Sequence, residues 1–250
     1  MNFEKMSQNI YRLKVPFADN YTAVFAIVDG NEVILYDSGD SESDVQLCIL
    51  PALEKLGLVP TILVASHAHR DHAGGLPALS EAFPNAKIKV GDPLRHKGLE
   101  CKAQSLYDGE ALSTNLVAVA LAGHSSDMMG IFDKRERILL TGDGLQQWGI
   151  SRWGTIVTDR RAYMRSLDKV EDLDIECIIA SHEYAPLGSV AEGREEILEL
   201  LSECRETMYD IEDFVYECGS EDVDEILRRY GVAYPQRPPL FKSTVKNILK

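Results

Sequence analysis

The chain has 250 residues, of which 45% are hydrophobic, and a formal net charge of −14 that arises from 40 acidic and 26 basic residues. The hydrophobic fraction is typical of a globular protein with a buried core. The negative charge disfavours contact with nucleic acids and anionic membranes, so we expect neither as a partner. Residues 1–13 lack the apolar segment of a signal peptide, and we find no stretch long enough to span a membrane.

The cysteine pattern bears on the cellular compartment. The chain has five cysteines, an odd number, and none of them forms a Cys-x-x-Cys pair. This pattern favours free thiols over a disulfide framework. Free thiols are stable in a reducing environment, so we expect a cytoplasmic protein.

Strand and helix patterns alternate along the first part of the chain. The expected elements are strands at 8–14, 21–29 and 32–37, a helix at 43–56, a strand at 61–66 and a helix at 74–83. The turn Asp29-Gly30-Asn31 links two of these strands as a hairpin.

The same alternation continues to about residue 187. Further strands are expected at 87–91, 104–107, 116–122, 129–133, 136–141 and 177–180, with a helix at 159–170. Strands that alternate with helices and also form hairpins predict mixed sheets covered by helices. The predicted fold class is therefore α/β (α+β).

The pattern becomes helical from about residue 188. Apolar residues recur at steps of three and four from Ile197 to Val215, which predicts one or two amphipathic helices, and another helix is expected at 221–230. We therefore divide the chain into a main domain, residues 1–187, and a C-terminal helical extension, residues 188–250. The apolar seam of this extension fits packing on the chain's own body, and a homodimer contact is the alternative.

A cluster of metal-ligand side chains follows the predicted strand at 61–66. Residues 67–72 read His-Ala-His-Arg-Asp-His, and two glycines come soon after them. The cluster is thus expected on a loop at the end of a buried strand, where functional groups are often held by a rigid scaffold. Imidazole nitrogens suit zinc and iron, and a carboxylate adds a hard oxygen ligand.

Three more ligand-type residues follow other predicted strands. These residues are His124, Asp143 and His182, and each comes after an apolar segment. Because strand ends at one edge of a layered α/β protein meet in one crevice, we expect these side chains to join the cluster at 67–72. Five imidazoles and two carboxylates in one crevice would bind two divalent metal ions.

In this order the residues resemble those of metallo-β-lactamase-fold hydrolases, in particular the glyoxalase II-like branch. The resemblance covers about residues 8–186 and depends on the motif at 67–72, on His124, Asp143 and His182, and on an Asp-Ser-Gly turn that begins at Asp37. It implies an αββα four-layer sandwich with the metals at one edge. It also implies that residues 1–187 are the catalytic domain.

The resemblance implies a role for each of these residues. His67, His69 and His124 would bind the first metal, Asp71, His72 and His182 would bind the second metal, and Asp143 would bridge the two. Asp37 would form hydrogen bonds near the ligand loop, and a turn-capping Asp37 is the alternative. The expected cofactors are two divalent ions, with Zn²⁺ expected first and Fe or Mn as alternatives.

Such a ligand set supports hydrolysis. Two metals in such sites lie about 3.5–4 Å apart and share an oxygen. A metal-bound water can have its pKa lowered to about 7, and the resulting hydroxide attacks a carbonyl whose oxyanion the second metal stabilises. We therefore expect a hydrolase of a small ester-, thioester- or lactone-like molecule, with Asp71 and Asp143 as its catalytic carboxylates.

Four residues are candidates for the wall of the substrate pocket: Gln146, Trp148, Trp153 and Tyr184. The first three lie between two ligands in the sequence, and Tyr184 follows His182 by two positions. Aromatic side chains would supply the apolar area that small-molecule pockets need. The alternative is that the tryptophans only cover the edge of a sheet. Gln146 also stands where lactonases of this superfamily have a tyrosine, which weakens the lactone interpretation.

A second class of function fits the same motif. Persulfide dioxygenases share this fold, with a single iron held at the positions that match His67, His124 and Asp143. A metal-binding protein without turnover is a third possibility, but the complete ligand set argues against it. The sequence does not separate zinc from iron, because imidazole and carboxylate bind both.

Overall fold

The first sheet has seven strands and forms one half of a sandwich. The computed structural model describes residues 1–99, 102–150 and 152–250. Strands β1 to β4 pair in antiparallel fashion, whereas β4 to β7 pair in parallel, in the order β1-β2-β3-β4-β5-β6-β7. The strands are β1 (Glu4–Lys5), β2 (Ile10–Phe17), β3 (Asn20–Asp29), β4 (Glu32–Tyr36), β5 (Ile62–Ala65), β6 (Lys87–Val90) and β7 (Ala103–Ser105).

The second sheet has five strands in the order β12-β11-β10-β9-β8. Its pairs are antiparallel except for β10 and β11, which run in parallel. The strands are β8 (Leu116–Ala120), β9 (Met129–Asp133), β10 (Ile138–Leu140), β11 (Cys177–Ile179) and β12 (Val190–Glu192).

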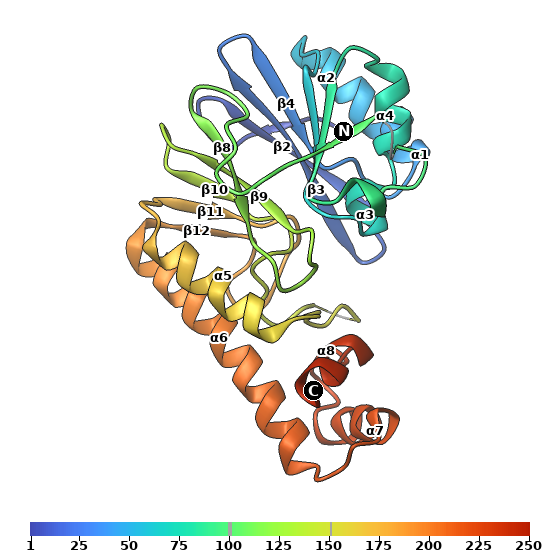
Figure 1. Ribbon diagram of the computed structural model, residues 1–250, viewed down its shortest axis with the longest axis vertical. Helices are drawn as coiled ribbons and strands as arrows, with labels where there is room; N and C mark the ends of the chain where they lie inside the picture. The colour runs from blue at the N-terminus through green and yellow to red at the C-terminus, as the bar shows by residue number, and fades with distance from the viewer. Residues whose placement is uncertain (100–101, 151) are drawn as a thin grey trace.

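Helices cover the outer face of each sheet, which gives the four-layer αββα arrangement (Figure 1). The helices beside the first sheet are α1 (Glu42–Asp44), the π-helix η1 (Val45–Ile49), α2 (Leu50–Leu56), α3 (Arg70–Ala73) and α4 (Leu76–Ala82), and the 3-10 helix η2 (Pro93–Arg95) follows β6. Four more helices follow strand β10 in the chain: α5 (Arg160–Asp172), α6 (Gly193–Glu217), α7 (Val223–Ala233) and α8 (Lys242–Ile248). The predicted fold class is confirmed.

Three apolar clusters hold the four layers together, as the alternating strands predict. One cluster, which includes Phe25 and Ile131, lies between the sheets. A second, which includes Leu35 and Leu53, joins the first sheet to its helices. The third joins the second sheet to α5 and α6. The site therefore sits on a scaffold that is packed on both sides.

The helix expected at 43–56 contains a break that follows from its proline. The structure has α1, η1 and α2 in this stretch, and the N–H of Leu50 donates to the carbonyl of Val45, five residues back. Pro51 has no N–H to continue a regular helical ladder, so the turn before it widens. Gly57 then ends α2 in a left-handed conformation, as its sequence position predicts.

The amphipathic pattern after residue 188 forms a single helix, α6, and its apolar seam is buried within the chain. Ile197 and Cys204 pack in the cluster beneath α5, whereas Ile211 and Val215 pack against α7 and α8. The interpretation that the seam packs on the chain's own body accounts for this burial, and the homodimer contact remains a prediction.

The division at residue 188 also remains a prediction. Strand β12 pairs with β11 across this position, and the first half of α6 packs in the same cluster as α5. The final part of α6 forms a separate cluster with α7 and α8, which lie beyond one end of the sandwich (Figure 1). In the described part of the chain, no helix has the length and apolar character required to cross a membrane.

Candidate metal centre

The ligand loop begins at the end of a fully buried strand. Strand β5 is buried along its whole length, and His67 follows it after one residue. The loop then enters the short helix α3, which carries Asp71 and His72. Glycines follow because this turn packs against the loop after β4: a Cβ on Gly75 would lie 2.1 Å from the carbonyl oxygen of Ser38.

The structure brings the other ligand-type residues to the same place. His124 follows β8, Asp143 follows β10 and His182 follows β11. The Nε2 atom of His124 lies 3.1 Å from Nε2 of His67 and 2.9 Å from Nδ1 of His69. The Nε2 atoms of His72 and His182 are also 3.1 Å apart. All five imidazoles therefore direct ring nitrogens into one centre.

These side chains form two groups with a carboxylate between them. Within the first group, His67, His69 and His124, the nearest donor atoms all lie within 4.8 Å of one another, and the same holds for Asp71, His72 and His182. Asp143 contacts both groups, because its oxygens lie 3.3 Å from Nε2 of His182 and 3.6 Å from Nε2 of His124. Asp143 also forms a third group with His67 and His72, so its carboxylate lies beside residues of both other groups.

The first group consists of neutral imidazoles. Burial lowers the pKa of His67 well below its usual range and lowers the pKa of His124 to about 4. Burial also lowers the pKa of His69. At neutral pH these rings therefore present nitrogen lone pairs to one another at close range. A cation at this position would be favoured, since neutral imidazole is the form that binds metals.

The second group has a different electrostatic balance. Burial alone would lower the pKa of His72 and His182, but carboxylates outweigh it: Asp71 raises the pKa of His72, and Asp143 raises the pKa of His182 to about 10. Without a cation, these imidazoles hold protons between the two carboxylates. A divalent ion could take the place of those protons, so the donor set of this group also fits a metal.

The outer nitrogen of three imidazoles is held by a neighbouring oxygen. Nδ1 of His72 lies 2.7 Å from Oδ2 of Asp37, Nδ1 of His124 lies 2.8 Å from the carbonyl oxygen of Ile156, and Nδ1 of His182 lies 2.6 Å from that of Tyr21. Such contacts fix the orientation of the ring and leave the other nitrogen free to bind a metal. Asp37 is thus next to the ligand loop, as expected, and it also accepts from the N–H of Ser66.

A cavity of about 300 Å³ opens onto the two groups. Three of the four predicted pocket residues line it, namely Gln146, Trp153 and Tyr184, and so do five of the predicted ligands. The Tyr184 hydroxyl lies 3.4 Å from Oδ1 of Asp143 and accepts from the side-chain amide of Gln146. Burial raises the pKa of Tyr184, so its hydroxyl stays protonated at neutral pH.

Trp148 lies elsewhere, which corrects the predicted pocket. Its ring packs against the C-terminal cluster, and the guanidinium of Arg237 lies 4.6 Å from the ring centroid. Gly149 and Ile150 line the cavity, whereas Trp148 does not. The backbone of Trp148 forms an antiparallel bridge with Ala185, while its ring packs against the C-terminal cluster.

Sequence reasoning missed several residues of the cavity. Phe17 and Asn20, at the tight turn between β2 and β3, line it, and the ring centroids of Phe17 and Trp153 are 5.0 Å apart. Glu183, which follows a predicted ligand, also lines the cavity. Its position beside His182 was a usable signal, whereas nothing in the sequence marks the hairpin turn as part of a site.

Asp127 is a further residue that sequence reasoning missed. Its carboxylate accepts from the N–H of Ala68 and so fixes the ligand loop from the side of β9. It also pairs with Arg95, at 2.6 Å. His96 is buried near Asp127 and takes no part in the two ligand groups.

Comparison with known families agrees with this geometry. The sequence profile of the metallo-beta-lactamase superfamily matches residues 18–182. This range includes the six residues of the two groups and Asp143, the carboxylate between them. The chain therefore belongs to the metallo-β-lactamase superfamily.

Individual relatives include hydrolases and thioesterases. A hydroxyacylglutathione hydrolase from Enterobacter sp. (strain 638) is 29% identical over 169 residues, which cover 67% of this chain and 63% of the relative. Hydroxyacylglutathione hydrolase 1 of Vibrio vulnificus is 33% identical over 172 residues, 66% of this chain and 63% of the relative. An atrochrysone carboxyl ACP thioesterase from Aspergillus fumigatus is 31% identical over 156 residues, 61% of this chain and 47% of the relative. The chain thus spans less than two thirds of the length of these relatives.

Solved structures share the fold at low sequence identity. A metallo-β-lactamase from Erythrobacter litoralis has a TM-score of 0.61 at 20% identity and covers 82% of this chain and 96% of its own. A metallo-β-lactamase from Pontibacter korlensis has a TM-score of 0.64 at 13% identity and covers 82% of this chain and 98% of its own. These likenesses support the four-layer fold.

Proposed function

We propose that the protein is a dinuclear metal-dependent hydrolase of a small ester-, thioester- or lactone-like substrate. The observation that carries this proposal is the pair of ligand groups joined by Asp143. A structural metal site closes around its ion, whereas here both groups open onto one cavity. An ion at each position would therefore be accessible to a substrate.

In this proposal each ion has its own set of ligands. His67, His69 and His124 hold the first ion, and Asp71, His72 and His182 hold the second, with Asp143 shared between them. When bound, such a pair of ions supplies hydroxide near neutral pH and Lewis-acid stabilisation of the developing oxyanion. Zn²⁺ is the proposed ion, because histidine-rich sets with carboxylates suit it.

The protein's own side chains position the substrate. Phe17, Ile150, Trp153 and Ile156 give the cavity an apolar wall, which suits the acyl part of a substrate. The protonated Tyr184 hydroxyl, 3.4 Å from Asp143, can donate a hydrogen bond to an oxygen of the substrate. Asp71 and Asp143 are the catalytic carboxylates of the proposal. Thr22 donates to Oδ2 of Asp71 at 3.3 Å and so orients that group.

Among the three substrate types, the relatives favour an acyl thioester. The Aspergillus fumigatus protein is named as an ACP thioesterase, and the bacterial proteins are named as hydroxyacylglutathione hydrolases. Each of these names denotes removal of an acyl group by hydrolysis. Gln146 contacts the ring of His124 and accepts a hydrogen bond from the N–H of Ile156. Tyr184, which also lines the cavity, supplies an aromatic hydroxyl for a substrate.

A substrate screen with controlled metal content tests the proposal. Protein loaded with Zn²⁺ would be offered a short acyl thioester, an aryl ester and a γ-lactone, and the same protein stripped with a chelator would serve as control. We expect turnover of at least one substrate, loss of it after stripping and recovery after Zn²⁺ is restored. Turnover that persists without metal would contradict a metal-dependent hydrolase.

A further inference from the structure

A second groove lies on the other side of the ligand loop. Its volume is about 520 Å³, and it is lined by the basic side chains of Arg70, Arg95 and Lys97 and by the buried His96. Among the described residues, no acidic side chain lines this groove. The chain as a whole carries a net charge of −14, so a cavity whose charged lining residues are all basic departs from the rest of the molecule.

One side chain of the groove has an unmet hydrogen bond. His96 is 5% exposed, and its Nε2 atom has no hydrogen-bond partner. The nearest carboxylate oxygen, Oδ2 of Asp127, is 4.0 Å away, which is too far for a hydrogen bond. Buried polar atoms are normally paired, so an unpaired imidazole nitrogen that lines a groove points to a ligand atom.

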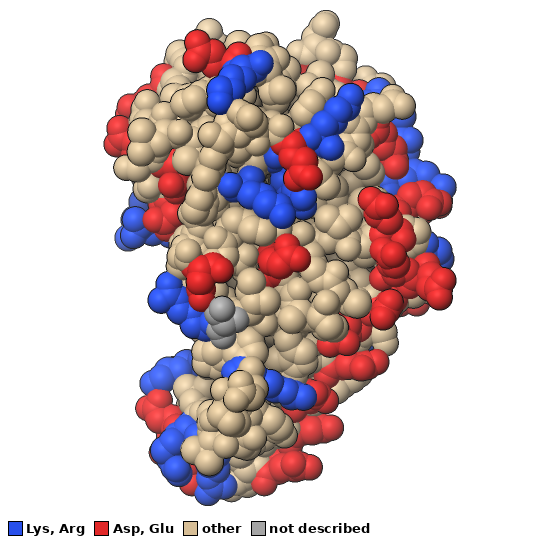
Figure 2. Space-filling view, turned by 180° about the vertical axis from the view of Figure 1, so that it is seen from behind, with Lys and Arg blue, Asp and Glu red and all other residues tan. Residues whose placement is uncertain are grey.

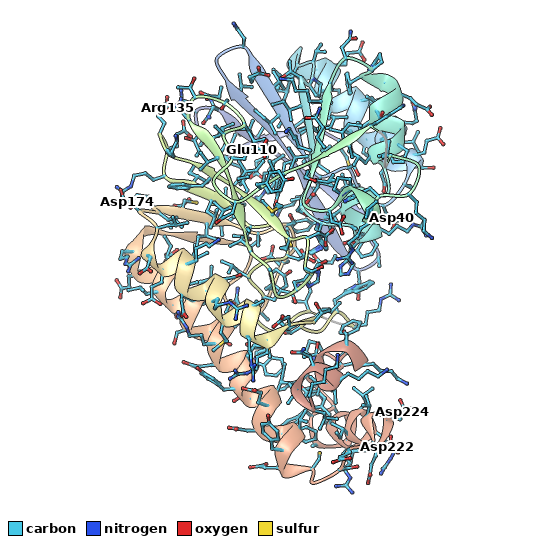
Figure 3. All side chains as sticks on the ribbon, viewed as in Figure 1. Asp40, Glu110, Arg135, Asp174, Asp222 and Asp224 are labelled. Carbon is cyan, nitrogen blue, oxygen red and sulfur yellow. The ribbon has the colours of Figure 1, made fainter. Side chains whose placement is uncertain are left out.

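The two arginines of the groove are held in place by other groups. Arg70 pairs with Asp40 at 3.1 Å, and Figure 3 labels Asp40 beside helix α3. Arg95 donates to Oγ of Ser125 at 2.8 Å and pairs with Asp127. The planar donors of a guanidinium group match the oxygens of a phosphate, so both arginines could contact an anion in the groove.

Arg70 also connects the groove to the metal centre. It lies between His69 and Asp71 in the ligand loop and lines both the groove and the cavity over the two ligand groups. A substrate whose acyl group lies in the metal cavity could therefore extend its other end past Arg70. That end would move away from Glu183, which lines the metal cavity, and enter a groove whose charged side chains, among the described residues, are basic.

We propose that this groove is a binding site for a phosphate group on the thiol or alcohol arm of the substrate. The inference rests on the proposed hydrolase function and adds a substrate class to it: acyl thioesters or esters whose leaving group carries a phosphate. Arg70 and Arg95, each beside its carboxylate partner, supply guanidinium donors, Lys97 supplies an exposed ammonium group, and His96 supplies a buried nitrogen. A phosphate dianion accepts several such bonds at once.

The test compares two thioesters that differ only in the phosphate. The probes are S-acetylpantetheine and S-acetylpantetheine 4′-phosphate, and the measured quantity is the ratio of their kcat/KM values on Zn²⁺-loaded protein. We expect the wild type to prefer the phosphorylated substrate. Lys97→Glu should lower that preference about fivefold or more, since it reverses one exposed charge beside the phosphate. Lys134→Glu, a matched charge reversal on the turn after β9, should leave the ratio unchanged.

The outcomes separate this inference from the proposed function. Hydrolysis of both thioesters with no phosphate preference, or with a preference that Lys97→Glu retains, would contradict the phosphate site. The same result would leave the proposed hydrolase function intact. If neither thioester is hydrolysed, pantetheine 4′-phosphate would be titrated with the metal-loaded protein and followed by its ³¹P line width. Broadening that Lys97→Glu weakens and Lys134→Glu preserves would support the groove, and equal broadening in all three proteins would contradict it.

Discussion

Oδ2 of Asp37 lies 2.7 Å from Nδ1 of His72, and both side chains are fully buried. Asp37 adopts a left-handed backbone conformation, with φ of 69°, at the turn that follows β4. Its other carboxylate oxygen accepts from the N–H of Ser66, at the end of β5. One carboxylate thus fixes both the start of the ligand loop and the ring of a candidate ligand, so that Nε2 of His72 faces Asp71 and His182.

Asp37→Asn tests this orienting contact. The substitution keeps the shape of the side chain and tolerates the left-handed backbone, but it removes the charge beside His72. We expect the affinity for the second metal ion to fall about 10- to 100-fold, the range typical of such supporting contacts. Competition with a chromophoric chelator measures it. Asp172→Asn, an exposed change on α5, is the control, and an affinity equal to wild type in both variants would show that Asp37 only shapes its turn.

Asp143→Ala tests the carboxylate between the two groups. Its oxygens lie 3.3 Å from His182, 3.5 Å from His72 and 3.6 Å from His124, so its removal takes a ligand from both proposed ions. We expect turnover to fall to the level of metal-stripped protein while the fold is retained, which circular dichroism and steady-state kinetics would show together. Full activity in this variant would remove Asp143 from the site.

Trp153→Ala tests the apolar wall of the cavity. The Trp153 ring packs 5.0 Å from that of Phe17, and its Nε1 donates to Asp19 at 2.7 Å, so the indole is held at the mouth of the cavity. The ring would contact the acyl group in ground state and transition state alike. We therefore expect KM to rise about tenfold with kcat little changed, most clearly for long acyl chains. A fall in kcat at unchanged KM would point instead to a role in the chemical step.

Helix α8 supports the loop that carries this wall. The Thr244 hydroxyl accepts from the N–H of Val157 and donates to the carbonyl of Thr155, both at 3.1 Å, although the residues lie almost 90 positions apart. The carbonyl of Ile156, between those two residues, holds His124. A Cβ on Gly154 would lie 2.0 Å from the carbonyl oxygen of Pro239, so the loop also packs tightly on the segment before α8.

Thr244→Val should therefore affect both stability and substrate binding. It leaves a buried N–H and a buried carbonyl without their partner, which costs about 1–3 kcal/mol of the free energy of unfolding. We also expect a higher KM, because Ile150 and Trp153 belong to the loosened loop. Thr244→Ser keeps the hydroxyl and should restore KM. Chemical denaturation and kinetics measure the two effects, and a KM that is normal in the valine variant would separate α8 from the cavity.

The strand-end ligands could be predicted because each one is adjacent in sequence to the strand that places it. His124, Asp143 and His182 follow β8, β10 and β11, and the pairing of those strands brings them together. The same locality explains the αββα layers, whose helices and strands have clear apolar periodicity. Strand β1, with two residues, carries too little pattern to be found in this way, and β12 lies in the stretch after residue 188 that was expected to be helical.

The cavity walls depend on contacts between distant segments. Phe17 lines the cavity because the hairpin of β2 and β3 reaches the end of β11, where its ring lies 6.4 Å from that of His182. Trp148 lies close to Asp143 in sequence but faces the C-terminal helices, so proximity along the chain misplaced it. The sequence of α8 does not indicate that this helix supports the cavity loop. The support comes from the Thr244 hydroxyl, which contacts the backbone of Thr155 and Val157.

Acidic residues on α6 account for part of the negative charge found in the sequence. Figure 2 shows Asp and Glu side chains in a run along one side of the molecule. The exposed acidic residues of α6 include Glu199, Glu206 and Asp213. Burial raises the pKa of Glu203, and the neighbouring carboxylates raise it further. This surface agrees with the expectation that nucleic acid is not a partner, which remains a prediction.

The metal content of protein purified without added metal or chelator tests the central claim most directly. Wild-type protein and His182→Ala would be analysed together by elemental mass spectrometry against protein concentration. We predict about two divalent ions per chain, with zinc foremost, and about one per chain in His182→Ala, because His182 belongs only to the second group. About one iron per chain, unchanged by His182→Ala, would contradict the dinuclear hydrolase and favour the oxygen-dependent sulfur chemistry of a mononuclear iron enzyme.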